Sequence, residues 1–121
     1  MDAFNNASLG THPGNCAKFA TRPYLPHGLN GIIVSNEASI GKECTIYHQV
    51  TIGGGNGGSP TIGDHVEIGA GAKIVGPCHI GNNVHIGAGC VVAIDIPDNC
   101  TVVMPKPRII VKNTTTEITN E

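Results

Sequence analysis

Histidine is the residue type in this chain with the widest chemical range. An imidazole can serve as a general base near neutral pH or bind a metal ion. His27 has a distinctive setting, because Pro26 restricts the backbone before it and Gly28 frees the backbone after it. Such a setting can hold a side chain at a fixed place. The six histidines among the 121 residues are His12, His27, His48, His65, His79 and His85.

A glycine-rich stretch from Gly53 to Pro60 is the second feature that could take part in chemistry. Neither a Lys-Ser or Lys-Thr pair nor a helical pattern follows it, so it does not match a nucleotide phosphate loop. One interpretation is a flexible linker. The other is a functional loop, because a repeat structure that swells at a single corner usually does so for function. We favour the functional loop.

Both features adjoin or interrupt a six-residue repeat that runs from Val34 to Pro97. A period of six matches neither a helix nor a long strand, but it fits a chain that turns a corner every six residues. The repeat therefore predicts an all-β fold, a parallel β-helix of the hexapeptide type. Its one irregularity is a four-residue insertion after Ile52. The repeating aliphatic residues are Val34, Ile40, Ile46, Ile52, Ile62, Ile68, Ile74, Ile80, Ile86 and Val92.

Composition agrees with β-structure and excludes some partners. The chain has 15 Ile and 10 Val against 3 Leu, which favours strands over helices. The net charge of −2 comes without a basic patch, so we expect no nucleic acid partner. No apolar run approaches the ~20 residues of a membrane span, and no signal-peptide pattern opens the chain. We expect a cytoplasmic protein without membrane association.

The repeat register assigns several cysteines and histidines to places in the fold. Cys44, Cys78 and Cys90 occupy the fifth place of a hexad, where Ala and Val stand elsewhere. They are therefore predicted to be buried core residues rather than nucleophiles or ligands. His79 and His85 share the sixth place of successive hexads, on different faces of the prism. They cannot chelate one ion within a subunit, and we expect no metal site.

The limits of the repeat divide the chain into three parts. Residues 1–26 predict an irregular N-terminal cap that lies against the first coil or against a neighbouring subunit. Residues 27–112 form the β-helix domain, and their last part, residues 98–112, is expected to fold back and cap the last coil. Residues 113–121 are polar and predict a disordered tail.

The predicted prism is short. Three hexads make one coil, so the repeat supplies a little over three coils, and a strand spacing of about 4.8 Å makes the prism only ~15 Å tall. Such a column has a thin core and two open ends, so we expect it to self-associate along its flat sides. Three sides favour a three-fold ring, which predicts a homotrimer.

Two segments, GIIVSNEASIGKECTIYHQVTIGG and TIGDHVEIGAGAKIVGPCHIGNNVHIGAGCVV, resemble the hexapeptide-repeat acyltransferases. The similarity is greatest to the serine O-acetyltransferase branch and its sugar-acetylating relatives, and it covers roughly residues 27–110. The resemblance implies a left-handed parallel β-helix and a homotrimer with active sites between adjacent prisms. It also implies direct transfer of an acetyl group from acetyl-CoA to a hydroxyl, with a histidine as general base and backbone N–H groups at the oxyanion.

The resemblance also implies roles for individual residues. The catalytic histidine of the family precedes the strand that opens the repeat, which here makes His27 the candidate general base. His48, beside the strand that leads into the glycine loop, is the second candidate. Lys106 and Arg108, expected near the edge of the last coil, resemble the cationic segment that meets the CoA phosphates. The candidates for the rest of the acetyl-CoA site are Gly53, Gly54, Gly71, Ala72, Ala88 and Gly89.

The sequence departs from the serine acetyltransferase pattern in several places. Pro26 stands where the family has an aspartate, and Gly58-Ser59-Pro60 replaces the usual Asp-Arg-His-Pro. These departures remove groups expected to hold the charges of an amino acid. They leave open a sugar hydroxyl or amine in surface-polysaccharide synthesis as the acceptor. Asn120-Glu121 replaces the terminal isoleucine through which the family docks cysteine synthase, so we expect no such docking.

Two alternatives to this activity remain from the sequence. The γ-class carbonic anhydrases share the fold and bind zinc through histidines about five residues apart. The close pair here is six residues apart, which argues against a zinc hydratase. A non-catalytic β-helix that serves as an assembly module is the other alternative, but it would need neither the glycine loop nor His27.

Overall fold

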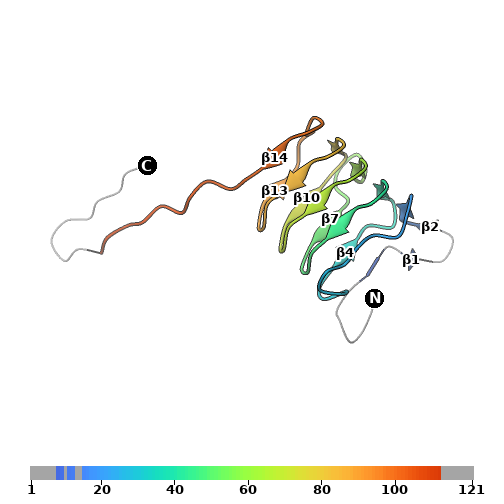
Figure 1. The fold of residues 1–121 in the computed structure, drawn as a ribbon, viewed down its shortest axis with the longest axis horizontal. Coiled ribbons are helices and arrows are strands. Elements are labelled where there is room, and N and C mark those ends of the chain that lie inside the picture. The colour runs from blue at the N-terminus through green and yellow to red at the C-terminus, as the bar shows by residue number, and fades with distance from the viewer. Residues whose placement is uncertain (1–7, 10, 13–14, 113–121) are drawn as a thin grey trace.

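The structure is a computed structural model that describes residues 8–9, 11–12 and 15–112 of the chain. Every regular element among these residues is a β-strand of two or three residues. Figure 1 shows the strands stacked in rows, with the chain turning a corner after each one. Short strands and frequent corners are what a six-residue period requires.

Three parallel sheets of four strands form the faces of a prism. The first face, turned toward the viewer in Figure 1, consists of β4 (Ile33–Val34), β7 (Thr51–Gly53), β10 (Lys73–Val75) and β13 (Val91–Val92). The second consists of β3 (Lys18–Phe19), β5 (Ser39–Ile40), β8 (Thr61–Ile62) and β11 (His79–Ile80). The third consists of β6 (Thr45–Ile46), β9 (Glu67–Ile68), β12 (His85–Ile86) and β14 (Thr101–Val102).

Each coil visits the first, second and third faces in turn, which confirms the predicted parallel β-helix. We call the passage from the first face to the second the first corner. The second corner leads from the second face to the third. The third corner leads from the third face to the first face of the next coil.

The repeated aliphatic residues stack on one another inside the prism. Ile52 pairs with Val34 in the coil before and with Ile74 in the coil after, and Ile74 pairs with Val92. Each buried isoleucine stabilises the fold by about 1.5–3 kcal/mol relative to exposure. The fifth-place prediction is confirmed, because the side chains at these positions are also buried, among them Cys44, Cys78 and Cys90.

The N-terminal part of the chain adds to the base of the prism. Ser8 pairs with Ile33 on the first face, β3 pairs with β5 on the second, and Tyr24 pairs with Thr45 on the third. A small antiparallel pair, β1 (Thr11–His12) with β2 (Asn15–Cys16), lies between the first two of these contacts. The described residues of the expected cap therefore follow all three faces as an irregular coil.

The C-terminal part differs from expectation. The prediction that residues 98–112 fold back over the last coil is wrong, because Thr101–Val102 adds β14 to the third face. Residues 103–112 then leave the prism as an extended, exposed arm (Figure 1). Pro105 and Pro107 lack the N–H groups that would pair this segment with a strand. The expected tail, residues 113–121, lies outside the described residues.

The last coil also has a shorter first corner than the hexad predicts. Ile96 pairs with Ile80, so the stacked residues Val92 and Ile96 are four positions apart in the sequence, where six were expected. Ile96 thereby takes the repeated aliphatic position rather than the fifth place of its hexad.

Candidate functional site at the third corner

The third corner carries most of the residues predicted to form a site. Successive turns at this corner are joined by backbone hydrogen bonds. The Gln49 N–H donates to the Asn30 carbonyl at 2.8 Å, the Gly71 N–H to the His48 carbonyl at 3.0 Å, and the Gly89 N–H to the Ala70 carbonyl at 2.8 Å. The corner residues Gly31, Gln49, Gly71 and Gly89 all have positive φ, between 62° and 75°. The turns therefore form one continuous ridge along the prism.

The two histidines predicted as catalytic candidates lie in contact on this ridge. The ring centroids of His27 and His48 are 5.0 Å apart, and the rings are nearly perpendicular at 83°. The Tyr47 ring is the other aromatic neighbour of His27, at 5.9 Å and 47°. The His27 turn is closed by the Asn30 side chain, whose Nδ2 donates to the His27 carbonyl at 3.1 Å. His27 is exposed, so its imidazole is accessible to a substrate.

His48 has one nitrogen whose environment is unusual. Its Nδ1 is buried and has no hydrogen-bond partner among the described residues. Leaving a buried polar atom unpaired costs about 1–3 kcal/mol, so such atoms are rare outside functional sites. This unpaired nitrogen belongs to the ring that contacts His27.

The predicted acetyl-CoA residues divide between two corners. Gly71, Ala88 and Gly89 lie on the third-corner ridge above His48. A Cβ added to Gly71 would meet only the Gly89 nitrogen, at 4.0 Å, so the surface there is open to the close approach of a ligand. The side chain of Ala72, by contrast, is fully buried in the core.

The glycine loop lies at the first corner, across the first face from His27. Gly55 and Gly58 exchange backbone hydrogen bonds of 2.9 and 3.2 Å, and the Ser59 hydroxyl bonds that of Ser35 at 2.9 Å. These bonds make it an ordered turn rather than a linker. Within one chain the loop does not lie beside His27, because the strands of the first face separate them.

Lys106 and Arg108 lie on the arm that leaves the prism, not at the edge of the last coil. Both side chains are exposed. Met104, at the base of the arm, approaches the ridge, since its Sδ would be 3.3 Å from a Cβ added to Gly89. The structure thus separates the two cations from the glycines expected to share a ligand with them.

Sequence reasoning missed Tyr47 beside His27 and the pairing of Glu67 with His85. On the third face, Oε1 of Glu67 lies 3.6 Å from Nδ1 of His85. The Glu67 charge is the main cause that raises the pKa of the Tyr47 phenol, followed by partial desolvation and a side-chain hydrogen bond to the same carboxylate. The 18-residue separation of Glu67 and His85, one full coil, was the signal that could have found this pair.

The remaining candidates do not form a competing centre. His79 lies on the second face and His85 on the third, as predicted, so one ion cannot bind both. No group of three potential metal ligands occurs among the described residues. Burial raises the pKa of the Cys44 thiol to about 12, which makes it a core residue and not a nucleophile.

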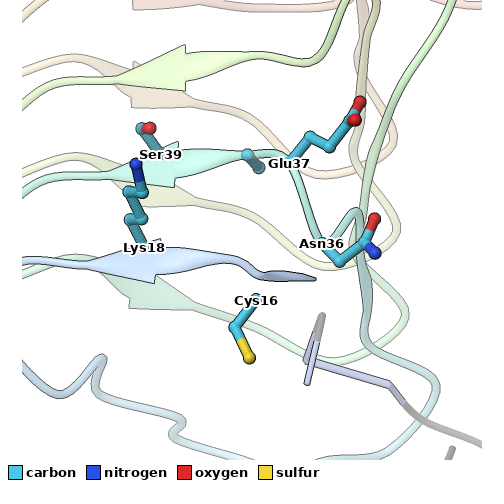
Figure 2. Close-up of a pocket in the computed structure, with 6 residues that line it drawn as sticks. Cys16, Lys18, Asn36, Glu37 and Ser39 are labelled. Carbon is cyan, nitrogen blue, oxygen red and sulfur yellow. The ribbon is translucent and has the colours of Figure 1, made fainter. Parts of the chain in front are cut away.

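A shallow pocket of about 250 Å³ lies on the second face near the base of the prism. Figure 2 shows Lys18 and Ser39 on neighbouring strands, with Cys16 on one side and Glu37 on the other. None of the predicted catalytic or acetyl-CoA residues lines it. The pocket is therefore separate from the third corner.

A protein-family model matches part of the β-helix. The family model described as bacterial transferase hexapeptide (six repeats) matches residues 59–93. The chain is 42% identical over 106 residues to a serine acetyltransferase of Synechococcus elongatus, which covers 84% of the chain and 42% of that relative. The chain thus spans about two-fifths of the length of this relative.

Solved structures give the same result. Serine acetyltransferase isoform 3 of Entamoeba histolytica, in complex with cysteine, superposes with a TM-score of 0.73 at 38% identity, covering 87% of this chain and 39% of that one. Serine acetyltransferase of Brucella abortus, in complex with coenzyme A, superposes with a TM-score of 0.65 at 35% identity, covering 74% and 38%. The described residues contain no helix that is long and apolar enough to cross a membrane.

Proposed function

The chain belongs to the hexapeptide-repeat transferase family, and on that basis we propose that it is a serine O-acetyltransferase-like enzyme that uses acetyl-CoA. Its relatives in the family carry the name serine acetyltransferase, and one of them has been solved with coenzyme A. The observation that carries the proposal is the His27–His48 contact on the ridge that continues through Gly71 and Gly89.

In the proposed reaction the exposed His27 imidazole accepts the proton of the acceptor hydroxyl. The hydroxyl oxygen attacks the thioester carbonyl carbon, and the developing oxyanion is stabilised by backbone N–H groups. The C–S bond then breaks, and the CoA thiolate leaves with the proton returned by His27. His48 packs against the base and helps to hold its ring.

The donor is proposed to lie along the ridge. The open backbone at Gly71 lets the pantetheine arm approach, and Ala88 adds little bulk beside it, while the Met104 side chain lies close to Gly89. The arm residues Lys106 and Arg108 offer charge to the phosphates of CoA. Because acetyl-CoA and serine are metabolites of the cytoplasm, we propose a cytoplasmic location.

We further propose that the active unit is a homotrimer. His27 and the glycine loop lie at opposite edges of the first face, so one chain cannot bring both to the same acceptor. Packing the first face of one chain near the third corner of a second would join the loop of one copy to the histidines of the next. The exposed apolar side chains of Ile33 and Val91 on that face favour such burial.

A sugar hydroxyl is the second candidate acceptor. The observation in its favour is local: Pro26 precedes His27, and the glycine loop ends in Ser59-Pro60 without the expected cation. Those positions would otherwise hold the charges of an amino acid. A neutral acceptor needs no such groups.

Release of free thiol from acetyl-CoA, measured with serine and with a panel of sugars, tests the proposal. We expect release with serine, and the ratio of kcat/KM values between acceptors assigns the substrate. A chain that binds no CoA and releases no thiol with any acceptor would be an assembly module rather than an enzyme.

A further inference from the structure

The imidazole of the proposed base is held by rings rather than by an acid. Among the described residues no carboxylate bonds to the His27 side chain. Its neighbours are the Tyr47 ring at 5.9 Å and the His48 ring at 5.0 Å. A general base needs a fixed orientation, so the groups that immobilise these rings decide how well His27 is placed.

Tyr47 stands at the end of a strand and faces outward. Its N–H donates to the Ile68 carbonyl at 3.0 Å, which extends the pairing of β6 with β9 by one residue. Ile46 and Ile68 are fully buried, and because side chains alternate along a strand, Tyr47 and Glu67 lie on the outer side of the third face. The backbone of Tyr47 is thus fixed by the core beneath it.

The outer end of the Tyr47 side chain meets Glu67. Glu67 lies on the neighbouring strand β9, on the same outer side of the third face as Tyr47. Its charge is the main cause that raises the pKa of the Tyr47 phenol, followed by desolvation and a side-chain hydrogen bond to the same carboxylate. The other side of the same carboxylate faces His85, with 3.6 Å between Oε1 and Nδ1. Glu67 is therefore held between two side chains of neighbouring coils.

We propose that Tyr47 is a positioning residue for His27, and that Glu67 anchors Tyr47 through its hydroxyl. The proposal rests on the proposed function, in which His27 is the general base. Tyr47 touches the base and not the reacting atoms. It limits rotation of the imidazole, and Glu67 limits rotation of the phenol.

The first experiment tests the anchor without using activity. The chain has two tyrosines and no tryptophan, so in a Tyr24→Phe background the ultraviolet absorbance of tyrosinate reports Tyr47 alone. We expect Glu67→Gln to lower the pH at which Tyr47 ionises, and the matched control Glu37→Gln to leave it unchanged. Circular dichroism at each pH verifies that the β-helix is folded. An unchanged midpoint in Glu67→Gln overturns the anchor.

The second experiment tests the positioning. We expect Tyr47→Ala to lower kcat about tenfold or more with little change in KM, because orientation and not binding is lost. Tyr47→Phe keeps the ring and recovers part of that loss. Glu67→Ala removes the acceptor and is expected to match Tyr47→Phe. The Tyr47→Phe/Glu67→Ala double variant is expected to be no worse than either single variant, because all three break the same contact. Full kcat in Tyr47→Ala, or multiplicative effects in the double variant, overturns the proposal.

The proposed acetyltransferase activity and the positioning role of Tyr47 can be disproved separately. An active wild-type enzyme whose kcat is insensitive to Tyr47→Ala leaves the proposed function standing and removes the positioning role. A wild-type chain that releases no thiol removes both. Thermal unfolding of each variant separates loss of placement from loss of fold, because neither side chain belongs to the buried core.

Discussion

At the scale of single residues, contact and burial separate chemistry from structure. His27 and His48 are accessible or partly so and touch one another, whereas the three fifth-place cysteines are sealed in the core. Similar titratable groups therefore take opposite roles because of where the register puts them. His27 is open to a substrate on the ridge, and Cys44 is not.

Replacing each histidine of the pair tests which one is the base. We expect His27→Ala to lower kcat by about 10²–10⁴-fold, the usual contribution of general base catalysis. His48→Ala should affect the rate less, since the His48 ring is proposed to pack against the base rather than to remove a proton. Steady-state thiol release measures both. A near-full rate in His27→Ala with a loss of about 10²-fold in His48→Ala would reverse the assignment.

Alkaline stability is expected to depend on Cys44. An unfolded thiol loses its proton near pH 9, but burial raises the pKa of Cys44 to about 12 in the folded state. Between these values the folded state holds more protons than the unfolded state, so the free energy of unfolding falls as pH rises. Cys44→Ala should flatten that fall, as urea unfolding at about pH 8 and about pH 10.5 will measure. The control Val50→Ala lowers stability at both pH values and keeps the slope, and an unchanged slope in Cys44→Ala would contradict the assignment.

At the scale of elements, the corners of the prism, rather than its strands, carry the candidate site. At the second corner, side-chain oxygens of Asp64, Asn82 and Asp98 accept hydrogen bonds from backbone N–H groups of the coil before, at 2.7–2.8 Å. Backbone hydrogen bonds join successive turns at both corners, from the His65 N–H to the Lys42 carbonyl at the second and from the Gly71 N–H to the His48 carbonyl at the third. Among the described residues no side-chain oxygen accepts such a bond between turns at the third corner, and the surface at Gly71 is open.

Close stacking of the coils predicts unequal effects for two glycine substitutions. A Cβ at Gly69 would lie 2.6 Å from the backbone nitrogen of Ala88, whereas one at Gly53 would meet only ordinary contacts at 3.6 Å or more. We expect Gly69→Ala to lower the free energy of unfolding by about 1–3 kcal/mol. Gly53→Ala should change it little. Urea unfolding compares the two, and equal midpoints would show that the coils can separate without cost.

At the scale of the whole molecule, the structure separates the parts of the proposed site, and we propose that two copies complete it together. The first face separates the glycine loop from His27, and the arm carries Lys106 and Arg108 away from the prism. An isolated chain presents two partial sites at opposite edges of one face. A closed three-fold ring would join each pair of edges.

Complementation between two inactive variants tests this sharing. One variant carries His27→Ala, and the other lacks Gly55 to Gly58, a deletion that restores the six-residue period. Each alone is expected to be inactive. Mixed oligomers should recover part of the activity, because some sites then combine an intact histidine with an intact loop. Sedimentation measures assembly, and a stable monomer, or no recovery in mixed trimers, would argue for a site within one chain.

The sequence by itself determined the features that depend on period. Aliphatic residues at every sixth place specify the fold, the three faces, the buried cysteines and the separation of His79 from His85, because register alone assigns each residue to a face. The insertion at Gly53 to Pro60 was visible for the same reason.

Only the tertiary structure decided which residues meet across coils and where the repeat lapses. His27 lies before the repeat, so no register related it to Tyr47 and His48 until the turns stacked. The short corner before Ile96 and the departing arm depend on how the last coil ends, which the six-residue pattern does not describe. The glycine loop and His27 lie at opposite edges of the first face, because the chain enters this face at the third corner and leaves it at the first. Closeness in sequence to a strand of this face does not say at which of its two edges a residue lies.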